Sequence, residues 1–186
     1  MTSAPAPRNQ WRSRLVLLLI AAAFLGSFGV AALLRFTGWE PAGRRNYGEL
    51  LQPPVALATH PLLRADGSRF DWQPERNTWR FLVAPAPGCT QACARTLDQL
   101  HRLWLAEGTK ANRVEVLWFG ELPAGPRFRT LQPMRADARL AAALPQAATA
   151  EAVPVYLVDP DGYLVLHYPP GFELGGVRRD LGKLVK

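Results

Sequence analysis

The feature that most limits the fold is a run of twenty residues without a charge, Leu15–Leu34. Arg12 and Arg14 precede this run, and Arg35 follows it. A helix of about 20 apolar residues is long enough to cross a bilayer. A cleavable secretory signal has a shorter apolar core, of about 7 to 15 residues, followed by a small-residue cleavage site. We therefore expect residues 15–34 to form a transmembrane anchor that is not cleaved.

The arginines on the two sides of this anchor nearly balance, so the charge rule gives only a weak preference for a cytoplasmic amino terminus. We place the tail, residues 1–14, in the cytoplasm, because a short tail, a span and a folded domain are the common layout of an exported, anchored protein. A lone pair of cysteines can also cycle between redox states outside the cytoplasm. The folded domain is therefore expected on the exported side of the membrane.

Residues 35–54 contain six glycines and prolines and no sustained periodicity, which is typical of a linker. Residues 55–186 have the ordinary size of one domain with its own core. The formal net charge of the chain is +7, of which the amino-terminal tail supplies +3. The other charges are scattered along the sequence, so their pattern does not predict a nucleic-acid partner.

Short apolar runs predict the strands of the domain. The last two runs are joined by the turn Asp159-Pro160-Asp161-Gly162 and form a hairpin. A second turn, at Asp66-Gly67, is expected to join two short strands within residues 62–72. The four main strands are expected over residues 79–84, 114–119, 153–158 and 163–168.

Helical spacing of apolar residues predicts three helices between and after these strands. A helix with one buried stripe follows the first main strand, an alanine-rich helix is expected over residues 134–144, and a terminal helix over residues 177–184. The order of elements predicts an α/β fold in which helices flank a central mixed sheet. Four residues form the buried stripe of the first helix: Cys93, Leu97, Leu100 and Trp104.

Cys89 and Cys93 are the only cysteines of the chain, and they lie between the first main strand and its helix. At a spacing of four residues, helical geometry places both sulfurs on one face, close enough for a disulfide or for joint binding of a metal. The partial positive charge at the start of a helix stabilises a thiolate, which is the form that attacks disulfides or binds soft metals. The alternative is a pair of small buried hydrophobic residues. We expect chemistry at this pair.

The order of elements, with the cysteine pair at the start of a helix, resembles a thioredoxin-like fold. The resemblance implies a role for Pro154, which precedes the strand that faces the cysteines. In thioredoxin-like proteins this proline is cis, its ring lies against the sulfurs, and the neighbouring backbone edge is free for a partner peptide. The sequence alone favours a trans bond, as for any residue that precedes proline.

More narrowly, the chain resembles the Sco/SenC family of cytochrome c oxidase assembly proteins. It shares the anchor, the Asp66-Gly67 turn, the Cys-x-x-x-Cys motif of Cys89 and Cys93, and the segment Tyr156–Gly162. The resemblance implies a single-pass protein of the bacterial inner membrane with its carboxyl-terminal domain in the periplasm. It also implies partners with thiols, namely an oxidase subunit or a copper chaperone.

The sequence departs from this family at the third copper ligand. Family members carry a histidine a few residues before the Tyr-Leu-Val-Asp-Pro strand, and Glu151 takes its place here. A carboxylate is a poor ligand for Cu(I), which prefers thiolate, thioether and imidazole. His60, His101 and His167 are expected in surface or polar-network roles, and His167 remains a ligand candidate only if the fold brings it close to the cysteines.

Three hypotheses follow. The leading one is thiol–disulfide exchange, in which Cys89 attacks a partner disulfide and Cys93 resolves the mixed disulfide, keeping copper-site cysteines of the oxidase or of a copper chaperone reduced. The second is a Cu(I) chaperone that holds the metal with the same two thiolates. The third is a structural assembly factor whose cysteines are incidental. Peroxidase chemistry is disfavoured, because Ala86 stands where peroxide-reducing relatives carry threonine or serine.

Overall fold

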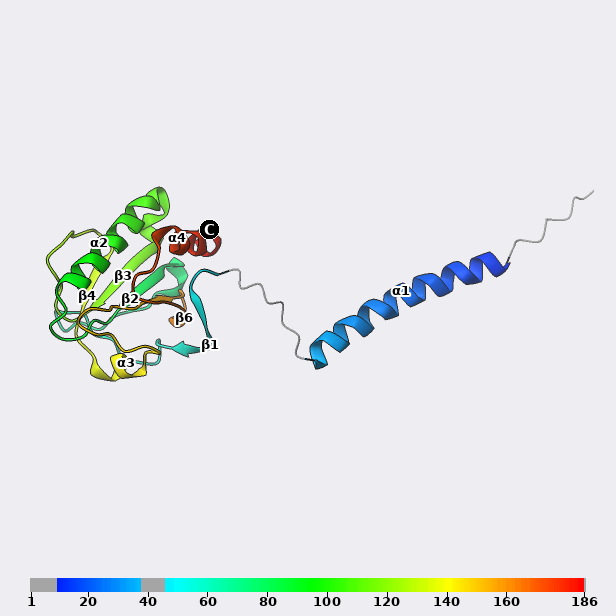
Figure 1. The fold of residues 1–186 in the computed structure, drawn as a ribbon, viewed down its shortest axis with the longest axis horizontal. Helices are drawn as coiled ribbons and strands as arrows, with labels where there is room; N and C mark the ends of the chain where they lie inside the picture. Colours follow the sequence, from blue (N-terminus) through cyan, green and yellow to red (C-terminus); the bar gives the residue numbers. More distant parts are fainter. Residues whose placement is uncertain (1–9, 38–45, 186) are drawn as a thin grey trace, which may run out of the picture. The chain divides into compact units, whose positions relative to one another are not determined.

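The computed structural model describes residues 10–37 and 46–185, and Figure 1 shows the arrangement of their helices and strands. The chain divides into two compact units, residues 1–44 and 45–186. The first unit contains a single described helix, and the second contains the sheet and the cysteine pair.

Helix α1 (Gln10–Phe36) includes the expected span and extends beyond it at both ends. By length and composition, with a mean hydropathy of 2.5, it is able to cross a membrane. Residues 1–9 of the predicted tail lie outside the described residues. Residues 10–14 of the predicted tail are helical and continuous with α1, because arginine is a good helix former and the helix runs through Arg12 and Arg14.

The second unit is built on a six-stranded sheet with the strand order β1-β6-β5-β2-β3-β4. Strands β2, β3 and β4 run parallel, whereas the pairs β2–β5, β5–β6 and β6–β1 are antiparallel. This is the mixed sheet that the sequence predicts. The strands are β1 (Glu49–Ala56), β2 (Trp79–Val83), β3 (Val114–Phe119), β4 (Leu131–Met134), β5 (Val155–Val158) and β6 (Tyr163–Tyr168).

Helices lie on both faces of this sheet (Figure 1). α2 (Gln91–Ala106) and α4 (Leu174–Leu184) contact each other on one face, and α3 (Ala138–Ala143) lies on the other. Successive side chains of a strand point to opposite faces, so Phe81 of β2 packs on the α2 side and Leu82 on the α3 side.

Two buried apolar clusters fill the spaces between the sheet and these helices. Both are formed wholly by residues after residue 50, so the second unit has a complete core without α1. The cluster under α2 and α4 includes Phe81, Cys93, Leu97, Trp118, Tyr168, Val177 and Leu181. The cluster on the α3 side includes Leu57, Leu62, Phe70, Leu82, Leu117, Leu140 and Tyr156.

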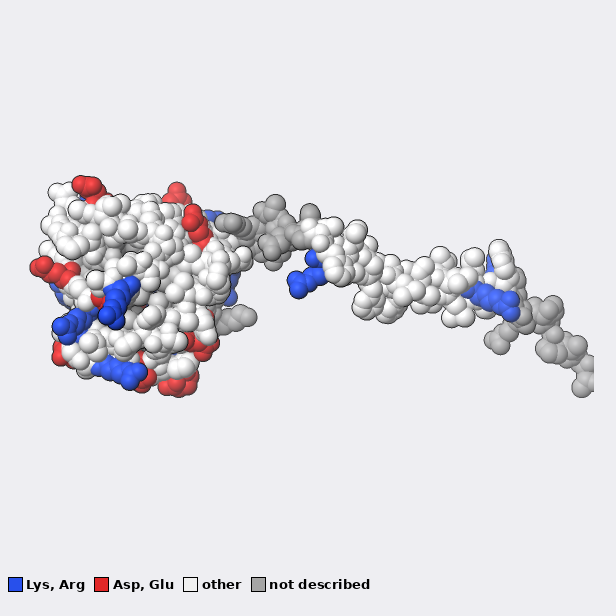
Figure 2. Space-filling model, turned by 90° about the horizontal axis from the view of Figure 1, so that it is seen from below, with Lys and Arg blue, Asp and Glu red and all other residues white. Residues whose placement is uncertain are grey.

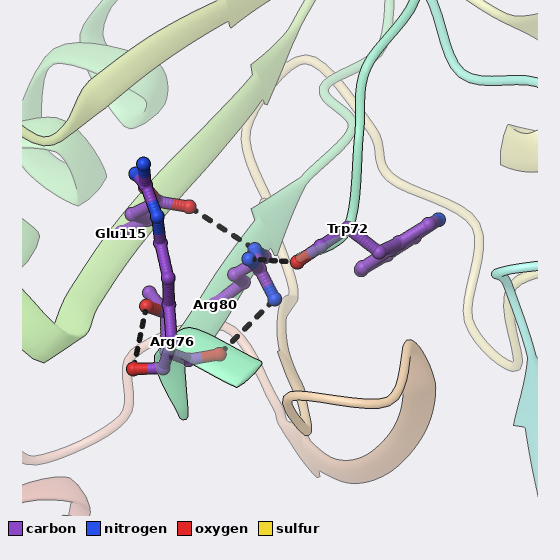
Figure 3. Close-up of polar contacts among 5 residues, drawn as sticks. Trp72, Arg76, Arg80 and Glu115 are labelled. Atoms are coloured by element: carbon purple, nitrogen blue, oxygen red, sulfur yellow. Dashed lines mark hydrogen bonds and ion pairs between the residues drawn. The ribbon is translucent and has the colours of Figure 1, made fainter. Parts of the chain in front are cut away.

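A buried arginine on β2 forms hydrogen bonds with the segment that precedes the strand (Figure 3). Arg80 forms an ion pair with Glu115 of β3, at 3.0 Å, and donates to the backbone carbonyls of Trp72 and Thr78. Its guanidinium also lies 5.6 Å from the centre of the Phe70 ring and 5.4 Å from that of Trp72. Burial lowers the pKa of Arg80, with the charge of Glu115 acting in the opposite direction.

The structure corrects the expected limits of three elements. The expected linker, residues 35–54, ends too late, because β1 begins at Glu49 and pairs with β6. The alanine-rich helix is shorter than expected, since Met134 pairs with Phe119 as the end of strand β4. The two short strands around Asp66-Gly67 are reduced to isolated bridges, one of which joins Leu63 to Arg69.

The charged residues of the second unit do not gather by sign on the face shown in Figure 2, where basic and acidic side chains both occur. This agrees with the scattered charges of the sequence.

Candidate functional site

Cys89 and Cys93 are joined by a disulfide, with their Cα atoms 5.7 Å apart. Cys93 lies in the first turn of α2, but Cys89 lies in the loop before it, since Thr90 is the residue that caps the helix. The sequence expectation that both sulfurs share one helical face is therefore wrong in its detail. The loop position still brings Cys89 to the helix start, because it directly precedes the cap.

The loop from β2 to α2 has the backbone geometry that its sequence requires. Pro85 and Pro87 have no N–H group to continue a ladder, so the strand ends at Val83. Gly88 has a φ angle of +79°, a region that favours glycine, and it turns the chain toward the helix. The backbone N–H of Cys89 donates to the carbonyl oxygen of Ala86, at 3.3 Å, which closes the turn.

The two sulfurs differ in how accessible they are. Cys93 is 1% exposed and belongs to the apolar cluster under α2, whereas Cys89 is only partly buried and packs at the edge of that cluster. Thr90 makes no side-chain cap to the first turn of α2, which leaves the backbone N–H groups of that turn to act on a nearby thiolate. Cys89 is therefore the sulfur that an external group reaches first.

A groove of about 690 Å³ opens beside Cys89. One wall is the loop and helix start, residues 85–91 with Ala94, and the other is formed mainly by residues 119–124 after β3, with Ala136. Strands β2 and β3 are parallel neighbours, so their carboxyl ends meet at the same edge of the sheet. The sequence analysis did not predict the second wall. The sequence feature that could have indicated this wall is a loop rich in proline and glycine that follows a parallel strand.

Pro154 is buried just before β5, and its peptide bond with Val153 is trans. The cis form that the resemblance implies is thus not the form that the structure has. Val153 belongs to the same apolar cluster as Cys93. Pro154 does not line the groove beside Cys89, whose described lining is formed by residues 85–91, Ala94, residues 119–124 and Ala136.

The structure separates His167 from the cysteines. His167 lies on β6, its ring stacks on Tyr156 of the α3-side cluster at 5.2 Å, and its Nδ1 atom lies 3.3 Å from Oε2 of Glu49. Cys93 packs on the opposite face of the sheet. His167 therefore cannot complete a copper site with the cysteines in this fold.

Glu151, His60 and His101 do not supply a third ligand in the described part of the chain either. Glu151 and His60 are exposed, and the ring of His101 packs 5.3 Å from that of Phe128. Within residues 10–37 and 46–185, no group of three His, Cys, Asp or Glu side chains is placed to hold a metal ion. The described chain thus offers Cu(I) two thiolates, and only after the disulfide is reduced.

The comparisons with known proteins agree with this geometry. A family model for a transmembrane-like, thioredoxin-like, C-terminal domain matches residues 79–186, which is more than half of the chain. The chain belongs to the transmembrane-like, thioredoxin-like family. The matched part of this family member runs from β2 through the cysteine pair to the end of α4. The thioredoxin-like fold predicted from the sequence is confirmed.

Solved structures of Sco proteins share this fold. A SCO1/SenC family lipoprotein from Bacillus anthracis is 11% identical, with a TM-score of 0.51, over 78% of this chain and 100% of that chain. Sco1 from Thermus thermophilus is 17% identical, with a TM-score of 0.51, over 77% and 99%. BsSco, a member of the Sco family of cytochrome c oxidase assembly proteins with a disulfide switch, is 10% identical, with a TM-score of 0.52, over 78% and 98%.

These identities establish likeness of fold, and the resemblance to Sco/SenC proteins is confirmed at that level. No protein with a curated description matches the sequence.

Proposed function

We propose that this chain is a membrane-anchored thiol–disulfide exchange protein that acts in cytochrome c oxidase assembly. The observation that carries the proposal is the Cys89–Cys93 disulfide at the start of α2, with Cys89 at the wall of an open groove. The fold that the chain shares with Sco proteins supports the biological setting. Helix α1 supports membrane anchoring. We propose that the membrane is the bacterial inner membrane, with the tail in the cytoplasm and the domain in the periplasm.

The exchange needs only the two sulfurs of the chain. In the reduced protein, the Cys89 thiolate attacks one sulfur of a partner disulfide, and the other partner sulfur leaves as a thiolate. The Cys93 thiolate then attacks Sγ of Cys89, which closes the Cys89–Cys93 disulfide and releases the second partner sulfur. Two electrons pass to the partner, and the protons given up by the two cysteines are available to its thiolates. A dithiol protein then reduces the chain again.

Pro154 and the backbone that precedes β5 are proposed as a supporting element for the partner peptide, as in the thioredoxin-like resemblance. The partner itself is proposed to be a protein with paired thiols, namely an oxidase subunit or a copper chaperone.

A Cu(I) chaperone is the second candidate function. It is favoured by the Cα separation of 5.7 Å, which lets two thiolates of the reduced protein bind one soft ion in two-coordinate fashion. It ranks second because the described residues place no third His, Asp or Glu ligand beside them. Copper is the cargo in this hypothesis, and neither cysteine needs to cycle through a disulfide.

Complementation of a deletion strain tests these functions against each other. We expect Cys89→Ser, Cys93→Ser and the double variant to lose oxidase assembly, and an added membrane-impermeant dithiol to restore it. Restoration by added copper and not by the dithiol would favour the chaperone. Full assembly with the double variant would show that the cysteines are incidental and that the chain is a structural factor.

A further inference from the structure

We propose that the groove beside Cys89 binds an uncharged, apolar segment next to the reacting cysteine of a partner polypeptide, and thereby selects protein disulfides over glutathione disulfide. The inference rests on the proposed thiol–disulfide exchange and names its substrate class. The partner's chain must pass through this groove, because Cys89 lines it and Cys93 is 1% exposed.

The second wall of the groove is held in place by the sheet. Val83 and Trp118 are partners in the parallel register of β2 and β3, so residues 119–124 leave the sheet beside the loop that carries Cys89. The buried Trp118 side chain donates its Nε1–H to the carbonyl oxygen of Glu121, at 3.0 Å. The N–H of Gly120 donates to the carbonyl oxygen of Met134, also at 3.0 Å. The wall is therefore preorganised for an extended ligand.

The chemistry of the lining favours an apolar chain. Pro85, Pro87 and Pro123 contribute apolar surface and no backbone N–H donor, and Phe119 and Leu122 add larger apolar side chains. A groove with this lining gains free energy from burying apolar side chains of a ligand.

The charge of the lining argues against glutathione. Among the described residues that line the groove, none is Lys, Arg or His, and the single charged residue is Glu121. Each half of glutathione disulfide carries two carboxylates and one ammonium, so its net charge is negative. The carboxylates find no cation in this groove, and the net negative charge is repelled by Glu121. A partner segment without acidic residues avoids that repulsion.

In the reaction, the partner's cysteine sulfur becomes bonded to Sγ of Cys89 while its neighbouring residues lie in the groove. The Cys89 thiolate supplies the electron pair for this bond, and the second sulfur of the partner disulfide leaves with the pair of the broken bond. The groove does not change these steps. It sets which disulfide reaches the sulfur in a productive position.

The test compares reaction rates of the reduced full chain, in detergent, with three disulfides: a peptide with apolar flanks, the same peptide with glutamates as flanks, and glutathione disulfide. Each rate is divided by that with hydroxyethyl disulfide, a small uncharged probe, so that altered reactivity of Cys89 itself cancels. We expect the wild type to prefer the apolar peptide over the other two by about tenfold.

Ala124→Arg places a cation in the second wall. It should raise the normalised rate with glutathione disulfide about fivefold and reduce the preference for the apolar peptide to about twofold. Ala142→Arg, at an exposed position of α3 outside the groove, is the matched control and should leave all ratios unchanged.

Equal normalised rates for the three disulfides in the wild type, or equal ratios in the two arginine variants, would overturn the groove assignment and leave the exchange function intact. No reaction of the wild type with any disulfide, hydroxyethyl disulfide included, would overturn the exchange function itself.

Discussion

The carboxylate of Asp180 accepts a hydrogen bond of 2.8 Å from the backbone N–H of Gly48, which lies 132 residues earlier in the chain. Asp180 is 1% exposed and also accepts from the N–H of Tyr47, at 3.0 Å. The Tyr47 hydroxyl in turn accepts from the N–H of Glu173 at the start of α4, at 2.7 Å. Hydrogen bonds thus hold the residues that precede β1 against helix α4.

Replacement of Asp180 by alanine should therefore destabilise the domain. The change leaves the N–H groups of Tyr47 and Gly48 without their acceptor, and we expect a loss of about 3 kcal/mol in the free energy of unfolding. Urea unfolding of residues 45–186, which hold a complete core, measures the loss, and hydrogen exchange measures the protection of the two amides. Asp98→Ala, which breaks the exposed ion pair with Arg102, is the control and should change stability by less than about 0.5 kcal/mol. Wild-type protection of both amides in Asp180→Ala would contradict the role of this contact.

Tyr168 gives the domain a predicted sensitivity to alkaline pH. Burial, and secondarily the charge of Asp180, raises the pKa of Tyr168 above its ordinary value. Below about pH 10 the Tyr168 hydroxyl is protonated in both the folded and the unfolded chain, so its contribution to stability is fully present. Above about pH 10 the unfolded chain releases the hydroxyl proton and the folded chain retains it. The free energy of unfolding therefore falls by about 1.4 kcal/mol per pH unit. The difference in unfolding free energy between wild type and Tyr168→Phe should be constant from pH 7 to 9 and fall above pH 10. A constant difference up to pH 11.5 would count against this linkage.

The Arg80 contacts predict a strong dependence of stability on a single buried cation. Arg80→Leu leaves the carbonyls of Trp72 and Thr78 without a donor and Glu115 without its cation, and we expect a loss of about 4 kcal/mol. Glu115→Gln keeps an oxygen acceptor for Arg80 and should lose about 1 kcal/mol. Urea unfolding of residues 45–186 measures both losses. Similar losses for the two variants would show that the carbonyl contacts contribute little.

Much of the sheet was predictable from the sequence, because its central strands are mainly apolar runs. The run at 114–119, for example, coincides with β3. The edge strands were not predictable in this way. Pro53 and Pro54 lie within β1 and Pro133 within β4, and prolines are tolerated there because an edge strand has one side without ladder hydrogen bonds.

The cysteine pair of the site was also predictable, since its spacing and position in the sequence are local properties. The wall at 119–124 was not, because its place beside Cys89 depends on the parallel register of β2 and β3. The position of His167 depends on side-chain alternation along β6, which puts it on the face opposite Cys93. A one-residue change of register would reverse that face, so sequence alone could not decide it.

The difference in exposure between the two cysteines predicts unequal behaviour of the single serine variants. Cys93→Ser keeps the accessible thiol of Cys89 and removes the group that resolves a mixed disulfide, so it should accumulate a covalent complex with a disulfide peptide. Cys89→Ser keeps only a thiol at a position that is 1% exposed, and we expect it to react with the same peptide at least about tenfold more slowly. Mass spectrometry of the intact full chain, sampled over time, measures both products. Equal rates of adduct formation in the two variants would contradict the role of Cys89 as the attacking sulfur. Faster adduct formation in Cys93→Ser than in Cys89→Ser makes Cys89 the attacking sulfur and Cys93 the resolving one.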